Sequence, residues 1–396
     1  MKKIGIFFNG KLKKNAGGPS GYLYNLKIGI ENNNIPVDFI VSRSMPPVVD
    51  DKTSNNKSIS IKMPMAVLDF RMALSFIFKG VKVRNHLKQL VNEYDFLHAH
   101  SSEDIFALKK LLKYKGKIVF TPHRPESLAN EVIVTQKVMN NTKYPFPILR
   151  LTCRFLEVYS YKHADAFIFP SINAKEIYKL FPGFQKNSTG KPIQYVYTGT
   201  NDVGNLVECG KYRKLVDNYK KSAKIISYVG RHNYIKGYDL LVETYERMNE
   251  ANVFYLCAGA KSTIEYPLAE NWIELGYIYD SNCLMKDSDI VVIPNRNTYF
   301  DLVIVEALSV GTIVITSNTG GNLDIAEEAQ GLILFEAGNC DSLISKIEFV
   351  LKKDKGELDT MKESNRDFYK KYCKIERFAE SYYTAIKSLV KSLEEV

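Results

Sequence analysis

The chain has 396 residues, of which 45% are hydrophobic and 25% are charged, which is the composition of a globular protein and excludes a disordered chain. A chain of this length is too long to fold around one ordinary hydrophobic core, so two domains are expected. The formal net charge of +10 indicates an anionic partner, such as a membrane surface or a phosphorylated ligand. Nucleic acid is not expected, because the aromatic residues lie in apolar runs rather than in a nucleic-acid-binding module.

No apolar run reaches the 18 residues that would span a bilayer. The basic and then apolar start, 1–8, is too short for a signal peptide and predicts a first buried strand. The six cysteines form no Cys-x-x-Cys pair. Their scatter argues against a zinc site or a disulfide framework and favours a reducing, cytoplasmic compartment.

Short β-rich runs alternate with amphipathic helical stretches along the chain. The runs are nearly continuous in apolar residues, which is typical of strands buried on both faces of a parallel sheet. Strands are predicted over 3–8, 37–41, 96–99, 117–120, 166–169, 224–229, 253–257, 290–293 and 312–316. Helices are predicted over 238–248 and 374–396, and a polar stretch at about 198–222 is the best linker candidate. Repeated β-α-β units predict doubly wound sheets, which bind ligands beyond the carboxyl ends of their strands.

Two stretches of the N-terminal half, 63–90 and 146–161, mix apolar with basic residues. The first includes Lys79, Lys82 and Arg84. Such patterns are typical of helices that lie in a membrane interface, and equally of core helices with solvated basic faces. The residues leave both interpretations open.

Two histidine-containing segments lie at the ends of predicted strands. His98 and His100 share one face of a strand end, but no third ligand lies at a useful spacing for a metal. His123 follows the next strand in Thr121-Pro122-His123, where a lone histidine is more often structural.

A basic loop follows the strand over 224–229. Arg231 and Lys236 lie five residues apart and flank a loop that opens a helix near Gly237. Fixed positive charges together with backbone N–H donors suit a diphosphate. A solvated basic loop explains the spacing equally well.

Carboxylates mark two further segments. Glu306 lies in an otherwise apolar helical stretch, where a buried carboxylate is costly unless it is hydrogen-bonded. It is either a partly exposed helix residue or a group that binds the hydroxyls of a polyol such as ribose. Asp287 and Asp289 have the spacing of an Asp-x-Asp metal motif, but they stand at a strand entry, and metal binding is not expected there.

The basic loop and the Glu306 segment, in this order, resemble the retaining GT-B glycosyltransferases of family 4. That family has Gly-Arg-x4-Lys-Gly followed by Glu-x7-Glu. The resemblance implies that Arg231 and Lys236 neutralise the leaving diphosphate and that Glu306 binds the nucleotide ribose. It also implies that backbone amides of one turn face the donor; the turn comprises Phe300, Asp301, Leu302 and Val303.

The same resemblance extends over nearly the whole chain. It implies that His123 touches the donor sugar and that His100 lies near the acceptor. Further donor contacts are implied for Gly17, Gly18, Tyr277 and Ile278. The chain departs from the family at two positions, with Thr298 in place of the first glutamate and Asp301 in place of a glycine. The threonine hydroxyl can still donate and accept, but it is neutral and shorter, which puts the identity of the sugar in doubt.

The family implies an α/β GT-B fold, with two Rossmann-like doubly wound domains that face each other across a cleft. An acceptor domain is expected over 1–198 and a donor domain over 199–372, with the helix at about 373–396 packed back on the first. The implied reaction is transfer from an NDP-sugar to a hydroxyl of a glycan or lipid-linked saccharide, with retention and without a metal or other cofactor. Bacterial surface polysaccharide synthesis, at the inner face of the cell membrane, would be its setting.

Two alternatives stay open. A sugar-nucleotide epimerase has the same fold, and the neutral Thr298 is consistent with a nucleotide-sugar-binding pseudoenzyme or scaffold partner. A dinucleotide oxidoreductase is disfavoured, because no Gly-x-Gly-x-x-Gly follows the first strand.

Overall fold

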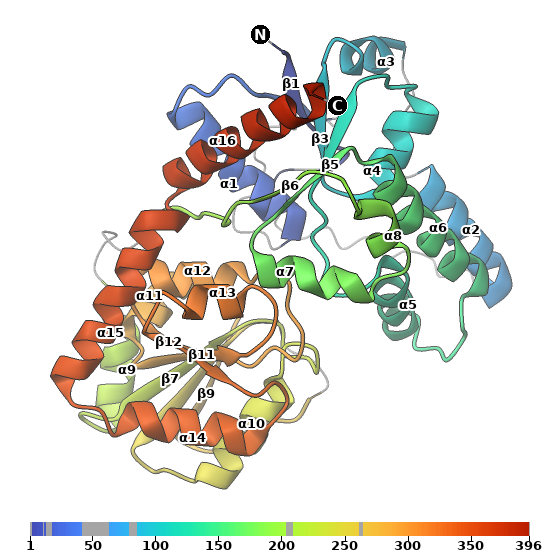
Figure 1. Cartoon of the computed structure of the whole chain (residues 1–396). Helices are drawn as coiled ribbons and strands as arrows, with labels where there is room; N and C mark the ends of the chain where they lie inside the picture. The colour runs from blue at the N-terminus through green and yellow to red at the C-terminus, as the bar shows by residue number, and fades with distance from the viewer. Residues whose placement is uncertain are drawn as a thin grey trace. The chain divides into compact units, whose positions relative to one another are not determined.

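The computed structural model (Figure 1) describes residues 2–10, 12, 18–41, 63–78, 85–202, 209–260 and 264–395. The chain forms two compact units, each built from more than one segment. Unit 1 comprises Met1–Phe169, Ile177–Tyr195 and Tyr382–Val396. Unit 2 comprises Pro170–Glu176 and Val196–Ser381.

Unit 1 contains a parallel six-stranded sheet of order β2-β1-β3-β4-β5-β6. Its strands are β1 (Ile4–Phe8), β2 (Asp38–Val41), β3 (Phe96–Ala99), β4 (Lys117–Phe120), β5 (Ala166–Phe169) and β6 (Ile193–Tyr195). Its helices are α1 (Gly18–Asn32), α2 (Met65–Ile77), α3 (Asn85–Val91), α4 (Ser102–Phe106), η1 (Ala107–Leu111), α5 (Leu128–Met139), α6 (Pro147–His163), η2 (Ile177–Leu180) and α8 (Phe184–Ser188). The second part of α16 (Ile375–Glu394) also belongs to this unit.

Unit 2 contains a second parallel sheet of order β12-β11-β10-β7-β8-β9. Its strands are β7 (Lys224–Val229), β8 (Val253–Ala258), β9 (Trp272–Gly276), β10 (Ile290–Ile293), β11 (Ile313–Ser317) and β12 (Leu332–Phe335). Its helices are α7 (Ile172–Glu176), α9 (Lys211–Tyr219), α10 (Tyr238–Met248), α11 (Ser281–Asp287), α12 (Leu302–Ser309), α13 (Asn322–Ala326), α14 (Cys340–Leu351), α15 (Lys355–Phe368) and η3 (Tyr369–Cys373).

Helices cover both faces of the unit 2 sheet. Alternate residues of each strand point to opposite faces, so Val292 packs in one core cluster and its neighbours Val291 and Ile293 in another. Helices α10 and α14 pack in the first cluster and α12 in the second, and α15 contributes Met361 to the first and Phe368 to the second (Figure 1). This double burial explains why the strands are almost continuously apolar.

The predicted β-α alternation is confirmed. The predicted strands 96–99, 117–120, 166–169, 224–229 and 290–293 coincide with observed ones. Three others differ by one residue at one end, and 312–316 is shifted by one residue from β11. Strands β6, β9 and β12 are not among the strands predicted from the apolar runs. The linker prediction is wrong in part, because α9 occupies Lys211–Tyr219; its buried residues Tyr212 and Val216 are four apart and so share one helix face.

The scatter of the cysteines, which argues against a disulfide framework, did not predict the disulfide that the structure contains. Cys209 and Cys283 are disulfide-bonded although they are 74 residues apart. Packing of α9 against α11 brings them together. The cysteine pattern therefore no longer argues for a reducing compartment.

Candidate functional site

Each sheet has one switch point, where the chain changes the direction in which it adds strands. In unit 2 this point lies between β7 and β10, and in unit 1 between β1 and β3. Ligands of doubly wound sheets bind beyond the carboxyl ends of strands at such points. The predicted site residues that the structure describes lie in the loops and helices that follow the strands at these edges, so each unit is described in turn.

In unit 2, the loop from Gly230 to Gly237 connects β7 to α10 and has a fixed shape. The Tyr228 hydroxyl donates to the Arg231 carbonyl at 2.7 Å, and the Lys236 amide donates to the Asn233 side chain at 2.9 Å. Gly237 has φ +66°, and a Cβ there would lie 1.9 Å from the Pro294 carbonyl oxygen. Only glycine fits, which agrees with the predicted helix start at this position.

The two cations of this loop have different surroundings. Arg231 is exposed, and its guanidinium forms no hydrogen bond or ion pair with the described residues. The Lys236 ammonium, in contrast, lies 2.9 Å from Oδ1 of Asp301, in the loop after β10. The loop therefore presents one open cation and one paired cation.

Asp301 is the centre of a small polar cluster. The Thr298 hydroxyl donates to its Oδ2 at 2.6 Å, and the Asn295 amide donates to the same oxygen. Burial by itself raises the pKa of Asp301, but the charge of Lys236 and these hydrogen bonds outweigh it and leave the pKa below its ordinary value. Asp301 is therefore ionised. The sequence offered no signal for this cluster beyond the two departures from the family pattern.

Glu306 lies on α12, one turn into the helix, and is partly buried. No hydrogen bond or ion pair of its carboxylate is found among the residues that the structure describes. Burial raises the pKa of Glu306 from its ordinary value of 4.5 to about 7. No side chain of the described residues caps the first turn of α12. The backbone amides of Leu302 and Val303, which belong to the predicted donor turn, therefore have no side-chain acceptor.

The remaining predicted residues of unit 2 follow strands at the same carboxyl edge of the sheet. Phe300 contacts the ring of Tyr197, with ring centroids 6.1 Å apart. Tyr277 and Ile278 follow β9 at the same carboxyl edge; Tyr277 is 69% exposed, whereas Ile278 packs against a core cluster. An exposed tyrosine at the sheet edge is available to stack on a flat ligand.

In unit 1, histidines gather at the ends of β3 and β4. Nδ1 of His100 lies 3.0 Å from Nε2 of His123. His98 hydrogen-bonds the Tyr382 hydroxyl of α16 at 2.9 Å and the Thr121 hydroxyl at 2.8 Å. Nothing in the sequence could link His98 to Tyr382, because 284 residues separate them.

These histidines are neutral. Burial, followed by the charge of Arg124, lowers the pKa of His123 to about 3. Burial also lowers the pKa of His98 and of His100 well below the ordinary value. Nε2 of His100 is buried and bonds no described residue. Uncharged rings at a ligand-binding edge suit hydroxyl groups rather than phosphates.

The predicted glycine loop is only partly described. Gly18 begins α1 with φ +65°, a backbone conformation that favours glycine. A Cβ at this position would meet no atom within 4 Å, so the conformation rather than crowding selects the residue. Gly17 lies outside the described residues.

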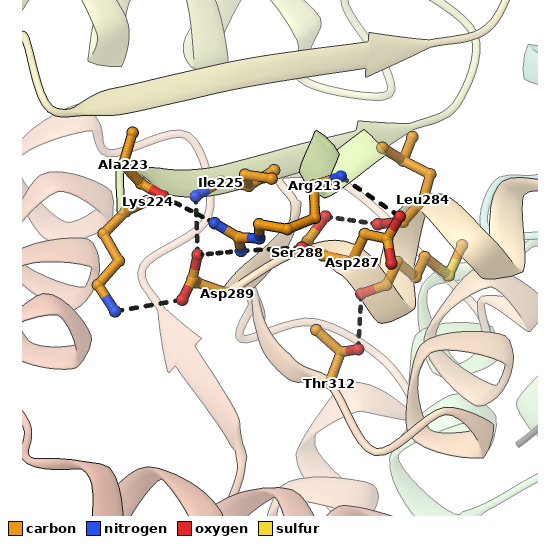
Figure 2. A network of polar contacts seen from close by, with 10 residues as sticks. Arg213, Ala223, Lys224, Ile225, Leu284, Asp287, Ser288, Asp289 and Thr312 are labelled. Carbon is orange, nitrogen blue, oxygen red and sulfur yellow. Dashed lines mark hydrogen bonds and ion pairs between the residues drawn. The ribbon is translucent and has the colours of Figure 1, made fainter. Parts of the chain in front are cut away.

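Asp287 and Asp289 bind groups of the protein itself (Figure 2). Asp287 accepts hydrogen bonds from the amides of Gly210 and Tyr212 at 2.9 and 3.0 Å. Asp289 binds the Arg213 guanidinium at 2.8 Å, as well as the Lys224 ammonium and the Ile225 amide. The pair thus joins α9 to the start of β7, and among the described residues no cluster of side chains suited to a metal ion is found.

Two family models match the chain and together span most of it. The model described as Glycosyltransferase Family 4 matches residues 16–202. The model described as Glycosyl transferases group 1 matches residues 214–368, which include Arg231, Lys236 and Glu306.

Individual relatives are similar at low identity. An uncharacterized glycosyltransferase of Methanocaldococcus jannaschii is 25% identical over 203 residues, 47% of this chain and 52% of that protein, so the match spans about half of its length. The O-antigen biosynthesis glycosyltransferase WclY of Escherichia coli is 23% identical over 290 residues, 69% of this chain and 74% of that protein.

Solved structures share the fold across the whole chain. Sucrose-phosphate synthase of Thermosynechococcus elongatus has a TM-score of 0.69 at 18% identity and covers 99% of this chain and 100% of its own. HepE of Anabaena, in complex with UDP and glucose, has a TM-score of 0.64 at 16% identity and covers 98% of this chain and 100% of its own.

Proposed function

Because the chain belongs to the group 1 glycosyltransferases and has their GT-B fold of two Rossmann-like domains, we propose that it transfers a sugar from an NDP-sugar to a hydroxyl of a glycan or lipid-linked saccharide. The observation that carries the proposal is the switch point of unit 2, where Arg231 and Lys236 lie in the loop after β7 and Glu306 follows β10. Cations suit a diphosphate, and an unpartnered carboxylate suits ribose hydroxyls.

The relatives support the substrate class. HepE was solved with UDP and glucose, and WclY is named for O-antigen biosynthesis. A nucleotide-sugar donor and a role in surface polysaccharide synthesis follow as the proposal for this chain.

The proposed mechanism is electrostatic. Arg231, Lys236 and the amides at the start of α12 stabilise the charge that develops on the leaving diphosphate, so no metal or cofactor is invoked. The anomeric configuration is retained, and the leaving phosphate takes the acceptor proton. In unit 1, the proposed contacts are made by neutral rings. His123 contacts the donor sugar, and His100 lies near the acceptor.

A thermal-shift screen with UDP, GDP, ADP and their sugars tests the donor, because a ligand of the folded state raises its stability. Transfer is then measured with the matching sugar in excess EDTA, where activity should persist. Activity lost in EDTA and restored by Mn²⁺ or Mg²⁺ would contradict the metal-free mechanism. Recovery of an epimerised donor would instead support an epimerase, and binding without any turnover a pseudoenzyme.

The proposal includes a peripheral position on an anionic membrane, supported by three helices of unit 1. Helix α6 packs against both α2 and α5 (Figure 1). Their inner faces share one apolar cluster, yet each helix also exposes large apolar side chains at helical spacing. The exposed residues are Val67, Phe70, Leu74, Val134, Val138, Met139, Ile148, Leu151 and Phe155.

The charges on these three helices favour an anionic surface. Arg71 and Arg154 are exposed, and Lys137 and Arg150 are partly exposed. Of the acidic residues, Asp69 and Glu157 are buried, and Glu131 is paired with Arg124. Basic side chains beside an apolar face are typical of interfacial helices, and the cytoplasmic leaflet is anionic. The predicted contacts Lys79, Lys82 and Arg84 lie outside the described residues.

No helix in the described part of the chain has the length and apolar character of a membrane span. Sedimentation with vesicles tests the proposal: binding to anionic vesicles at low salt and release at high salt are expected. Leu151→Glu with Phe155→Glu should abolish binding and leave NDP affinity unchanged. Leu180→Glu, which alters a residue 86% exposed elsewhere in unit 1, is the control. Equal sedimentation with neutral and anionic vesicles would refute the proposed association with an anionic membrane.

A further inference from the structure

The lysine of the basic loop already has an anionic partner. Its ammonium is 2.9 Å from Oδ1 of Asp301, and the two side chains are 27% and 12% exposed. Thr298 and Asn295 donate to the other carboxylate oxygen. Because all three neighbours donate to it, Asp301 is held as a carboxylate beside the cation that a diphosphate needs.

A helix-capping role does not explain this arrangement. Asp301 is the N-cap residue of α12, a position where aspartate usually accepts from the amides of the first turn. Here the side chain makes no such hydrogen bond and is directed to Lys236 in the loop after β7. The carboxylate therefore serves the lysine of the neighbouring loop rather than its own helix.

A diphosphate near this loop meets two cations and one anion. Arg231 is open to an incoming anion, but Lys236 can approach a phosphate oxygen only by sharing or leaving Asp301. Two anions that meet at one partly buried ammonium repel each other, and burial strengthens that repulsion.

We propose that Asp301 is an internal counter-ion that competes with the diphosphate of the nucleotide for Lys236 and so weakens nucleotide binding. The inference rests on the proposed function, since it assumes that Arg231 and Lys236 receive a diphosphate. Its consequence is that Lys236 is held in position before the donor arrives, while the product NDP is released more readily than from a site with two open cations.

Calorimetry of NDP binding tests the competition. Asp301→Asn retains the shape of the side chain and removes its charge, and NDP should bind about tenfold more tightly at low salt. The gain should shrink at high salt, where charges are screened. Asp341→Asn removes a carboxylate paired with Arg247 in the same unit and should leave the affinity unchanged.

A double-mutant cycle separates competition from simple repulsion. With Lys236→Met as background, the gain from Asp301→Asn should largely disappear; a gain that persists undiminished overturns the proposal, as does weaker or unchanged binding by the single variant. If the asparagine variant does not fold, Asp301→Gly removes the carboxylate at a position where a helix N-cap accepts glycine. A wild-type protein that binds no NDP refutes the proposed function instead, so the two failures are distinct.

Discussion

The two sheets each have one switch point at their carboxyl edge, and the two edges differ in chemistry. In unit 2 the edge carries Arg231 and an ion pair between Lys236 and Asp301. In unit 1 it carries His100 and His123, whose rings burial keeps neutral. Under the proposed function, the switch point specifies where a ligand binds, and the side chains specify its charge: an anionic ligand in unit 2 and an uncharged, hydroxyl-bearing one in unit 1.

The largest effect that tests this contrast is expected from Arg231→Ala. The open guanidinium is the cation that a diphosphate reaches without displacing a partner. Its charge-assisted hydrogen bonds contribute about 1.5–3 kcal/mol, so NDP affinity should fall roughly 10- to 100-fold in calorimetry, and turnover with it.

Arg247→Ala provides the matched control, since it removes an exposed arginine of unit 2 that pairs with Glu243 and Asp341 away from the loop. Lys236→Ala should also weaken binding, but it leaves Asp301 without its cation and should lower the stability as well. If Arg231→Ala leaves affinity and turnover unchanged, unit 2 is not organised around a diphosphate.

Glu306→Gln should have the next largest effect and sharpens the contrast through pH. In the proposed site, ribose hydroxyls donate to the ionised carboxylate of Glu306, so wild-type NDP affinity should decline as the pH falls below about 7, the raised pKa of Glu306. The variant should bind roughly tenfold more weakly above pH 7 and lack this pH dependence. Binding of inorganic pyrophosphate, which has no ribose, is the control.

The pH dependence of the stability also distinguishes the wild type from Glu306→Gln. The folded protein holds a proton on Glu306 up to about pH 7, whereas the unfolded chain loses it near 4.5. Wild-type stability should therefore fall as the pH rises between these values, and Glu306→Gln should be the more stable protein at pH 8. A variant that loses stability and keeps its nucleotide affinity would show that Glu306 is a structural helix residue.

Sequence patterns predicted the parts of the molecule that depend on local chemistry. Apolar runs marked the buried strands, and Gly237 marked a helix start that only glycine permits. The ion pair of Lys236 with Asp301 escaped prediction, because it joins loops 65 residues apart through an aspartate that would normally cap its own helix. The contact of His98 with Tyr382 was also not predicted, because it is made by tertiary packing, which the periodicity of a sequence does not encode.

His123→Ala tests the neutral histidines at the carboxyl edge of the unit 1 sheet and should have a smaller effect. A neutral hydrogen bond to the sugar contributes about 0.5–1.5 kcal/mol, so turnover should fall by up to about tenfold while NDP affinity stays the same. A loss of NDP affinity equal to the loss of turnover would contradict the division between the two edges.

The pH dependence of stability offers an independent measurement on this histidine. Unfolding exposes a ring that titrates near 6.5, whereas the folded ring stays neutral down to about pH 3. The unfolded chain thus binds more protons below pH 6.5, and wild-type stability should fall as the pH drops from 6.5. His123→Ala should make the decline of the urea midpoint shallower. A decline of unchanged steepness would mean that this ring is not held neutral by the fold.

The smallest effect is expected at the exposed tyrosines after β9. Tyr277 and Tyr279 are 69% and 87% exposed, and their rings are in contact with centroids 5.2 Å apart. Stacking of a nucleobase on Tyr277 contributes about 1 kcal/mol, so Tyr277→Ala should weaken NDP binding roughly fivefold and leave pyrophosphate binding unchanged. Tyr279→Ala, which removes a neighbouring ring of equal size, should change NDP affinity less. Equal losses in both variants, or a loss that extends to pyrophosphate, would mean that the tyrosines act on the loop rather than on the base. In that case the charged edge of unit 2 would recognise its ligand through phosphate and ribose, and the choice of base would lie elsewhere.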